Sequence, residues 1–529
     1  MSLSSTIDAI TNPSECIMER RVGHVDDVKI GEMKEVMVGE TPVLLMRLDG
    51  GYRALGARCP HYGARLVDGL LHDGRITCPW HHACFDALTG DLIEPPAIDA
   101  LAKYGVRISG DDVLVDVPDA PESRRTLPAT FARLRASDDV IAIVGAGAAG
   151  YMAAQTIREC GDQRPIVMIT SEDRPPYDRP NLSKDYLNGH ADPAWMPLRP
   201  SEFFEQNGIE LLQGVAVDRL DVAGRAIELS DGRSIAYAAA LIASGCQPRR
   251  LDVPGSDLDR VLTLRSFRDA DAIIAEAQEN HRVVVIGAGF IAMEAASSLA
   301  ARGMKVTVVA PDAVPFERTL GQTLGELLQS EHERNGVDFR LGRSVACIEG
   351  RRDRLVVLDD GERLPCDLVV VGIGVAPATG FARELKLDRN GGIIVDAMLR
   401  AAEAVYAAGD IAAFPDPRGT GQIRVEHWRT AMQLGRVAGF NIAGRERRFD
   451  GIPFFWTQQF DATIRYVGHA PSWEEVVLRG DVAERRFIAY YVNDGRVHAA
   501  ATMGRDRDAI AIAEQIRRSG FPTLDAVPQ

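Results

Sequence analysis

The 529-residue chain is 46% hydrophobic and carries a formal charge of −15. At about 150 residues per domain, this length predicts three or four domains with hydrophobic cores, which excludes a peptide, a disordered tail and a fibre. The acidic balance repels phosphate backbones at a distance, so nucleic acid is not an expected partner.

Residues 1–27 contain no apolar stretch long enough for the core of a signal peptide. No later run reaches the roughly 18 apolar residues that span a bilayer, and the longest ones, 236–243 and 368–375, are predicted to be buried strands. Eight cysteines are too few for a disulfide scaffold in a chain of this length. We therefore expect a soluble, cytoplasmic protein with no membrane span and with unpaired thiols.

Short β-type runs separated by turn residues fill the chain from about residue 36 to residue 117. Pro42–Leu48 and Arg75–Thr77 are examples, and Asp-Gly, Gly-Gly and Ser-Gly pairs lie between such runs. This pattern predicts a small all-β domain within residues 1–118. Residues 119–137 contain turn residues and charges but little strand pattern, which indicates a linker.

Two loops of this domain each carry one cysteine and one histidine. They are Cys59-Pro-His61 and Cys78-Pro-Trp-His81, with 16 residues between His61 and Cys78. A zinc finger usually takes both cysteines from one turn and both histidines from another. The order found here is typical of a Rieske [2Fe–2S] cluster, in which two thiolates hold one iron and two imidazoles hold the other. A structural zinc site is the alternative, and Cys84 is predicted to be an ordinary buried thiol.

Over roughly residues 20–117 the sequence resembles the Rieske ferredoxin family, which implies that these four residues are the cluster ligands. Respiratory-type members carry two further cysteines in a disulfide, and the matching positions here are Ala64 and Trp80. This departure implies a ferredoxin-like cluster of lower potential, which a nicotinamide-reduced flavin could reduce. The remaining histidines are widely scattered, so the second iron site of a Rieske oxygenase is not expected.

From Val140 onward, apolar strands alternate with Ala-rich helical stretches, which indicates α/β units on a parallel sheet. Two Gly-rich strand-to-helix turns nearly repeat one another, and such glycines let the backbone approach a dinucleotide pyrophosphate at a helix N-terminus. After the first turn and a second strand, an acidic residue is placed to bind a ribose. The candidate dinucleotide-binding residues are Gly145, Gly147, Gly150 and Glu172 in the first copy and Gly287, Gly289 and Ala292 in the second.

The second copy lacks the acidic residue that is expected at its strand end. Position 310 is Ala310, and the nearest carboxylate is Asp312, which becomes the candidate ribose ligand. No arginine directly follows the strand Lys305–Val309 to hold a 2′-phosphate. NADH is therefore preferred over NADPH as the expected co-substrate.

Further segments resemble the two-dinucleotide-binding-domain flavoprotein family. Tyr177-Asp-Arg-Pro-Asn-Leu-Ser-Lys184 is similar to the flavin-facing segment of bacterial ferredoxin reductases and apoptosis-inducing-factor-like proteins. Ala243–Gly245 and Val371–Gly374 resemble the two crossovers between the FAD and NAD domains, and Val405–Asp410 resembles the second FAD motif. With the Rieske segment, the whole chain is similar to apoptosis-inducing-factor-like, Rieske-bearing ferredoxin reductases.

The resemblance implies a multidomain fold: an all-β Rieske domain, then a glutathione-reductase-like α/β flavoprotein with one dinucleotide-binding domain inserted into the other, then an α+β domain. The expected divisions are a Rieske domain at 1–118, a linker at 119–137, an FAD-binding domain at 138–255 and 380–450, an NAD(P)H-binding domain at 256–379 and a C-terminal reductase (interface) domain at 451–529.

The resemblance also implies roles for single residues. Arg179 and Lys184 contact FAD, and Lys184 approaches the flavin while paired with Glu294. Asp410 binds the ribityl chain. Two tryptophans fall where the family lines the isoalloxazine edge, with a core or interface role as the alternative; they are Trp428 and Trp456.

A redox-active dithiol is not expected. Disulfide reductases of this superfamily carry a Cys-x4-Cys pair after the first Gly-rich loop, but between Gly150 and Lys184 the only cysteine is Cys160. Cys246, Cys347 and Cys366 are predicted to be structural. The Rieske cluster is therefore the expected acceptor of electrons from the flavin.

These features predict an NAD(P)H-dependent reductase that passes electrons through FAD to its own [2Fe–2S] cluster and then to a ferredoxin, an oxygenase component or another one-electron acceptor. Two alternatives remain open: a redox-sensing or signalling module, and an NADH oxidase that makes peroxide. The sequence does not name the terminal acceptor, and a homodimer is left open.

Overall fold

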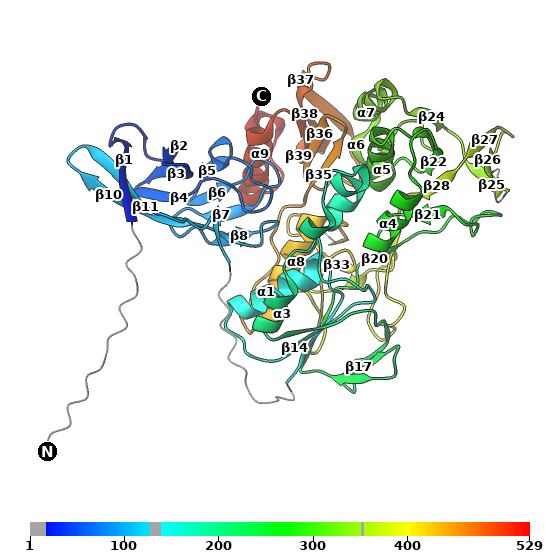
Figure 1. The fold of residues 1–529 in the computed structure, drawn as a ribbon, viewed down its shortest axis with the longest axis horizontal. Coiled ribbons are helices and arrows are strands. Elements are labelled where there is room, and N and C mark those ends of the chain that lie inside the picture. Colours follow the sequence, from blue (N-terminus) through cyan, green and yellow to red (C-terminus); the bar gives the residue numbers. More distant parts are fainter. Residues whose placement is uncertain (1–16, 127–138, 351–353, 420) are drawn as a thin grey trace. The chain divides into compact units, whose positions relative to one another are not determined.

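The computed structural model describes residues 17–126, 139–350, 354–419 and 421–529 (Figure 1). The chain divides into two compact units, Met1–Leu127 and Pro128–Gln529, and each is described by itself. Within the described ranges, no helix is both long and apolar enough to cross a membrane.

The first unit is built on a six-stranded antiparallel sheet with the order β1-β11-β10-β4-β3-β2. Side chains along β3 alternate between two cores, with Val43 and Leu45 on one face and Leu44 and Met46 on the other, as expected of a strand that is covered on both sides. The strands are β1 (Ile17–His24), β2 (Met33–Val38), β3 (Thr41–Leu48), β4 (Gly51–Gly56), β10 (Lys103–Ser109) and β11 (Asp112–Pro118).

A second, four-stranded antiparallel sheet of short strands carries part of the cysteine and histidine loops. The two strands predicted at residues 42–48 and 75–77 are confirmed as β3 and β6. The strands of the small sheet are β5 (Leu70–His72), β6 (Arg75–Thr77), β7 (Cys84–Asp86) and β8 (Leu92–Glu94), preceded by the 3-10 helix η1 (Leu66–Asp68).

The predicted linker is more ordered at its start than its composition indicates. β12 (Arg124–Arg125) pairs with β9 (Ala100–Leu101). The Arg125 guanidinium explains this pairing, because it donates to the carbonyl oxygens of Leu101 and Thr89, each at 2.7 Å. The rest of the predicted linker, from residue 127, lies outside the described residues.

The second unit begins with a sheet of order β15-β14-β13-β19-β32-β31, in which only β31 runs antiparallel. Helices α1 (Ala148–Glu159) and α8 (Trp428–Ile442) lie side by side against it (Figure 1). The strands are β13 (Ile141–Val144), β14 (Ile166–Ile169), β15 (Ile209–Leu212), β19 (Ala239–Ile242), β31 (Arg400–Ala402) and β32 (Val405–Ala407).

A second parallel sheet, of order β21-β28-β22-β23-β24, is inserted in sequence between β19 and β32. This is the predicted arrangement of one dinucleotide fold inside another. The elements are β21 (Val261–Thr263), β22 (Arg282–Ile286), β23 (Lys305–Ala310), β24 (Asp338–Leu341), β28 (Leu368–Val371), α4 (Phe267–Glu276), α5 (Phe290–Ala301), α6 (Glu317–Leu320) and α7 (Gln322–Arg334).

The C-terminal part folds as a five-stranded antiparallel sheet of order β35-β36-β39-β38-β37, covered by α9 (Asp506–Ser519). β35 packs against α5 of the inserted domain (Figure 1). The strands are β35 (Phe454–Gln459), β36 (Ala462–Gly468), β37 (Glu475–Asp481), β38 (Arg486–Asn493) and β39 (Arg496–Met503).

Small elements complete the second unit. The pair β20–β29 joins the two predicted crossover segments, because β20 follows Gly245 and β29 follows Gly374. The small elements are β16 (Val217–Asp221), β17 (Ala226–Leu229), β18 (Ser234–Ala236), β20 (Cys246–Pro248), β25 (Val345–Glu349), β26 (Arg354–Leu358), β27 (Arg363–Cys366), β29 (Val375–Pro377), β30 (Ile393–Ile394), β33 (Ala412–Pro415), β34 (Gln422–Ile423), η2 (Arg179–Ser183), α2 (Asp185–Asn188), η3 (Pro193–Trp195), α3 (Ser201–Gln206) and η4 (Leu524–Ala526).

Candidate functional site

The two cysteine loops of the first unit fold in the same way. The backbone N–H of Cys59 donates to Ala64, and that of Cys78 donates to Ala83, so each loop closes five residues after its cysteine. The residue before each closure has a left-handed backbone, Gly63 in one loop and His82 in the other. His82, which has no assigned role in the sequence, therefore occupies the position that matches Gly63.

The loops bring the four predicted ligands together as two pairs. The Nδ1 atoms of His61 and His81 lie 3.0 Å apart. Cys59 and Cys78 are buried, and the hydrogen bond between them, together with burial, raises the pKa of the Cys59 thiol well above its usual range. Burial lowers the pKa of His61 to about 3, so its imidazole is neutral and able to bind a metal.

This arrangement fits a two-iron cluster better than a single zinc ion. Zinc in a structural site takes four ligands around one ion, whereas here the two imidazoles form one pair and the two thiols form another. Two adjacent buried thiols need a cation between or beside them before both ionise. The pairs match the division of a [2Fe–2S] cluster into one Cys-bound and one His-bound iron.

The second unit contains a cavity of about 1430 Å³ that is lined from all three of its domains. Its walls include the two Gly-rich turns, η2, the start of α8 and the start of β35. Of the residues predicted to bind dinucleotides or flavin, the following line it: Gly145, Gly147, Glu172, Arg179, Lys184, Gly289, Glu294, Asp410, Trp428 and Trp456.

The glycines of the first turn serve different purposes. Gly145 has a φ of +109°, and a Cβ at Gly150 would overlap the carbonyl oxygen of Gly145, so these two allow strand and helix to pack. At Gly147 a Cβ would meet nothing within 4 Å, so this position opens onto the space in front of α1. The second turn repeats this with Gly287 (φ +110°) and Gly289, while the third position is the buried Ala292.

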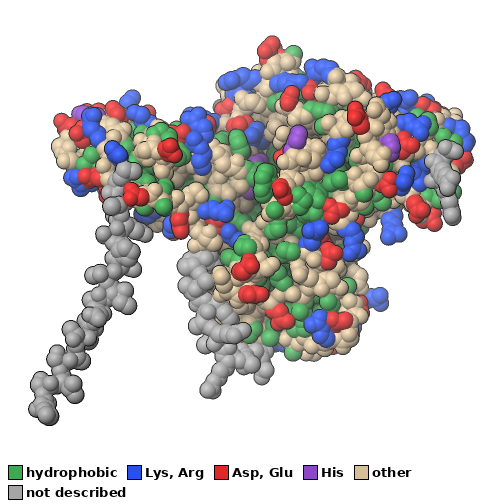
Figure 2. Space-filling model, in the orientation of Figure 1, with side chains coloured by type: hydrophobic (Ala, Val, Ile, Leu, Met, Phe, Trp, Pro, Cys, Tyr) green, Lys and Arg blue, Asp and Glu red, His purple; other side chains and the backbone are tan. Residues whose placement is uncertain are grey.

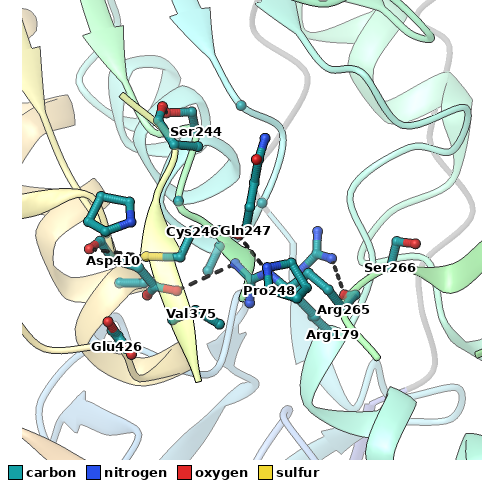
Figure 3. Close-up of a pocket in the computed structure, with 18 of the residues that line it drawn as sticks. Arg179, Ser244, Cys246, Gln247, Pro248, Arg265, Ser266, Val375, Asp410 and Glu426 are labelled. Carbon is teal, nitrogen blue, oxygen red and sulfur yellow. Dashed lines mark hydrogen bonds and ion pairs between the residues drawn. The ribbon is translucent and has the colours of Figure 1, made fainter. Parts of the chain in front are cut away.

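Charged side chains form a continuous network along one wall. Glu172 accepts hydrogen bonds from the Arg179 guanidinium at 2.6 Å and from the Tyr177 hydroxyl. Arg179 also donates to the carbonyl oxygen of Arg265, whose guanidinium lies 3.4 Å from Asp410. Figure 3 shows the Arg265 side chain reaching across the pocket between Arg179 and Asp410. Sequence reasoning missed Arg265, because no local motif surrounds it.

Lys184 and Glu294 form the predicted ion pair. The Lys184 Nζ lies 2.6 Å from the Glu294 Oε2, and both side chains are largely buried. Lys184 joins η2 to α2, whereas Glu294 projects from the first turns of α5. The pair therefore links the Tyr177–Lys184 segment to the inserted domain at the cavity wall.

The cavity has an aromatic side that sequence reasoning identified only in part. Trp428 begins α8, and Trp456 on β35 also packs against the C-terminal core. The His427 ring stacks on Phe455 with centroids 4.3 Å apart, and Phe290 packs against Phe455 at 4.7 Å. Burial lowers the pKa of His427 to about 3, so it adds a neutral ring to this wall.

Asp312 lies outside the cavity lining, as do Gly150, Gly287 and Ala292. It follows β23, where Ala310 is buried, and its carboxylate is 3.3 Å from the Arg318 guanidinium. Its role in binding ribose stays a prediction.

Cysteine chemistry is limited at this cavity. The described residues that line it include one cysteine, Cys246. Burial raises the pKa of the Cys246 thiol to about 12, so it is not a thiolate at neutral pH. Cys160, the cysteine nearest in sequence to the first Gly-rich turn, lies at the C-terminal cap of α1 and is not part of the lining.

Comparison with known proteins identifies both units. A family model described as "Pyridine nucleotide-disulphide oxidoreductase" matches residues 139–435, more than half of the chain. The chain belongs to this oxidoreductase family. The oxidoreductase also carries a match to the Rieske [2Fe–2S] domain over residues 19–105 and to the reductase C-terminal domain over 454–527. FAD and NAD(P)H are the cofactors of the first family, and a [2Fe–2S] cluster is that of the Rieske domain.

Its relatives include both animal and bacterial proteins. Apoptosis-inducing factor 3 of Homo sapiens is 37% identical over 522 residues, which is 96% of this chain and 86% of the relative. A ferredoxin–NAD(P)(+) reductase of Sphingomonas sp. is 34% identical over 375 residues, 70% of this oxidoreductase and 91% of the relative. The crystal structure of a covalent putidaredoxin reductase–putidaredoxin complex superposes with a TM-score of 0.70 at 29% identity, covering 73% of this chain and 94% of that one.

Two glycine substitutions separate packing from cofactor binding in this oxidoreductase. Gly150→Ala is expected to lower the free energy of unfolding of the apoprotein by about 1–3 kcal/mol, because the new Cβ overlaps the Gly145 carbonyl. Gly147→Ala is expected to leave unfolding unchanged but to weaken FAD binding at least about tenfold, because its Cβ enters the open space before α1. Urea unfolding and FAD titration measure the two effects. Parent-like FAD affinity in Gly147→Ala would contradict the assignment.

Proposed function

We propose that this chain is an electron-transfer reductase that passes electrons from NAD(P)H, through FAD and its own Rieske [2Fe–2S] cluster, to an external one-electron acceptor. NADH is the preferred donor, and a ferredoxin or an oxygenase component is the expected acceptor. Bound FAD supplies the conversion of a two-electron hydride donor into single-electron steps, which an iron–sulfur cluster requires.

The observation that carries this proposal is a buried Lys184–Glu294 pair in a cavity whose lining offers no thiolate. Disulfide reductases of related fold use a dithiol beside the flavin, but Cys246 is alone in the described lining and its raised pKa keeps it protonated. A one-electron centre is therefore the better match for the flavin's partner, and the first unit has the ligands for one.

The proposed roles of single residues come from the family resemblance and are compatible with the geometry of the cavity. Gly147 and Gly289 precede α1 and α5 and leave open space where a Cβ would stand, and the amides at these helix N-termini are proposed to hold the pyrophosphates of the two dinucleotides. Arg179 and Asp410 hold the flavin cofactor along the charged wall. Lys184, kept in place by Glu294, presents its ammonium group to the flavin and nicotinamide rings.

The relatives support a protein acceptor. One relative is named a ferredoxin–NAD(P)(+) reductase, and the superposed structure is a complex of a reductase with putidaredoxin. On the face of the second unit in Figure 2, basic and acidic side chains of the described residues are interspersed rather than gathered by sign. The overall charge of −15 therefore does not by itself repel an acidic partner from this face.

A steady-state comparison of acceptors tests the proposal. FAD- and iron-loaded protein is supplied with NADH and assayed for reduction of a [2Fe–2S] ferredoxin and, separately, for oxygen consumption. Ferredoxin reduction that exceeds oxygen consumption at least about tenfold is expected. Rapid oxygen consumption that survives replacement of Cys59 and His81 would favour an NADH oxidase. Slow flavin reduction without turnover with any one-electron acceptor would favour a redox-sensing module.

A further inference from the structure

The carboxylate of Glu294 is held on both of its oxygens. Lys184 Nζ and Ser183 Oγ each lie 2.6 Å from Oε2, and the Thr457 hydroxyl lies 2.7 Å from Oε1. Ser183 and Lys184 come from the Tyr177–Lys184 segment, whereas Thr457 comes from β35 of the C-terminal sheet. Three donors from two other domains thus fix a carboxylate that is 3% exposed.

The hydrogen-bonded chain continues away from the cavity. Gln459, on the same face of β35 as Thr457, donates its amide nitrogen to the Thr457 Oγ1 at 3.2 Å. Its amide oxygen lies 2.7 Å from the Nε2 of His332 on α7. Thr457, Gln459 and His332 are each at most 1% exposed, so water does not substitute for these bonds.

The hydrogen bonds of this row all run in one direction, from His332 toward Glu294. Burial lowers the pKa of His332 to about 4, so the imidazole is neutral, and it must donate from Nε2 because the amide oxygen of Gln459 only accepts. The Gln459 amide then donates to Thr457, which leaves the threonine hydroxyl hydrogen free to point at Glu294. Each bond orients the next toward the carboxylate.

We propose that Thr457, oriented by Gln459 and His332, is a positioning residue for the Lys184–Glu294 pair. The inference rests on the proposed function and extends it: the C-terminal sheet helps to set the reaction centre. Burying three polar side chains in a row is costly in a core. The three hydrogen bonds of the row offset part of that cost, whereas the Nδ1 of His332 is buried without a partner among the described residues. Among the described hydrogen-bond partners of these three side chains, the charged group is the carboxylate of Glu294.

Rapid mixing of the FAD-loaded full chain with NADH, without oxygen, tests this role. Thr457→Val keeps the side-chain shape and removes the hydroxyl, and it is expected to lower the limiting rate of flavin reduction about tenfold while changing the dissociation constant for NADH less than about twofold. Thr457→Ser keeps a hydroxyl at this position, and its limiting rate of flavin reduction is expected to match that of the parent. Thr502→Val is the matched control, because Thr502 is equally buried in the same sheet and its hydroxyl has no hydrogen-bond partner.

Two readouts separate positioning from a loss of structure. NAD⁺ is added to dithionite-reduced protein, and the long-wavelength charge-transfer absorbance between the reduced flavin and NAD⁺ is recorded. This absorbance is expected to be weaker in Thr457→Val than in Thr457→Ser or Thr502→Val. In a Glu294→Gln background, Thr457→Val is expected to slow the reaction less than about twofold further, because both changes act through one carboxylate. Independent, multiplicative effects would overturn the inference.

The outcomes for the inference and for the proposed function differ. If the parent flavin is reduced by neither NADH nor NADPH, the proposed function fails. If the parent is reduced and Thr457→Val matches it in rate and absorbance, only the inference fails. If Thr457→Val does not fold, Gln459→Met replaces it under the same criteria, with an expected loss of about threefold because the threonine hydroxyl remains but is no longer oriented.

Discussion

Cys59→Ser is expected to lower NADH-dependent ferredoxin reduction at least about 100-fold while flavin reduction by NADH stays within about twofold of the parent. A serine hydroxyl is a poorer ligand for cluster iron than a thiolate, so the cluster is expected not to assemble in this variant. The flavin cavity lies wholly within the second unit, which has its own cores, so its reduction does not depend on Cys59. Stopped-flow absorbance and a ferredoxin-coupled assay measure the two rates.

Cys84→Ser is the matched control for this change. Cys84 is as buried as Cys59, but it lies on β7, outside the two ligand loops. Iron content and ferredoxin reduction are expected to stay close to those of the parent. Ferredoxin reduction that persists in Cys59→Ser would place the electron exit at the flavin and remove the cluster from the path.

Glu294→Gln is expected to slow flavin reduction by NADH about 10²- to 10³-fold. The substitution removes the charge that balances Lys184 and leaves a largely buried ammonium group with only the Pro180 carbonyl as a further described partner. Slowing by this factor corresponds to about 2.7–4.1 kcal/mol, which overlaps the cost of about 3–5 kcal/mol for losing one member of a buried pair. Stopped-flow reduction at saturating NADH gives the limiting rate.

Glu331→Gln controls for the loss of a buried carboxylate. Glu331 is 4% exposed and pairs with Arg334 and Arg485, but it does not line the cavity. It is expected to lower the unfolding temperature without changing the limiting rate. Equal slowing in both variants would show that the Lys184–Glu294 pair acts through stability alone.

The features that could be predicted from the sequence are those set by short-range spacing. A Gly-rich turn between strand and helix, and a cysteine two or three residues before a histidine, impose their geometry within one loop. Both could therefore be assigned before the fold was known. The alternation of apolar strands and helices likewise predicted α/β units on a parallel sheet, whereas the insertion of one fold into the other was implied by the family resemblance.

The features that could not be predicted depend on residues far apart in the chain. Thr457 meets Glu294 across 163 positions, and Arg265 meets Asp410 across 145. Neither threonine nor arginine stands in a motif that marks it, so only the folded structure brings them to the cavity. The ordered start of the linker has the same origin, since Arg125 is held by the carbonyl oxygens of Thr89 and Leu101, which are 36 and 24 positions away.

Titration of the FAD- and iron-loaded protein with NADH under anaerobic conditions, followed by absorbance and electron paramagnetic resonance, tests the central claim most directly. The account predicts that the flavin absorbance is bleached and that the signal of a reduced Rieske cluster grows with it. A flavin that neither NADH nor NADPH bleaches, or a bleached flavin with no cluster signal in protein that holds iron at its four ligands, would contradict it.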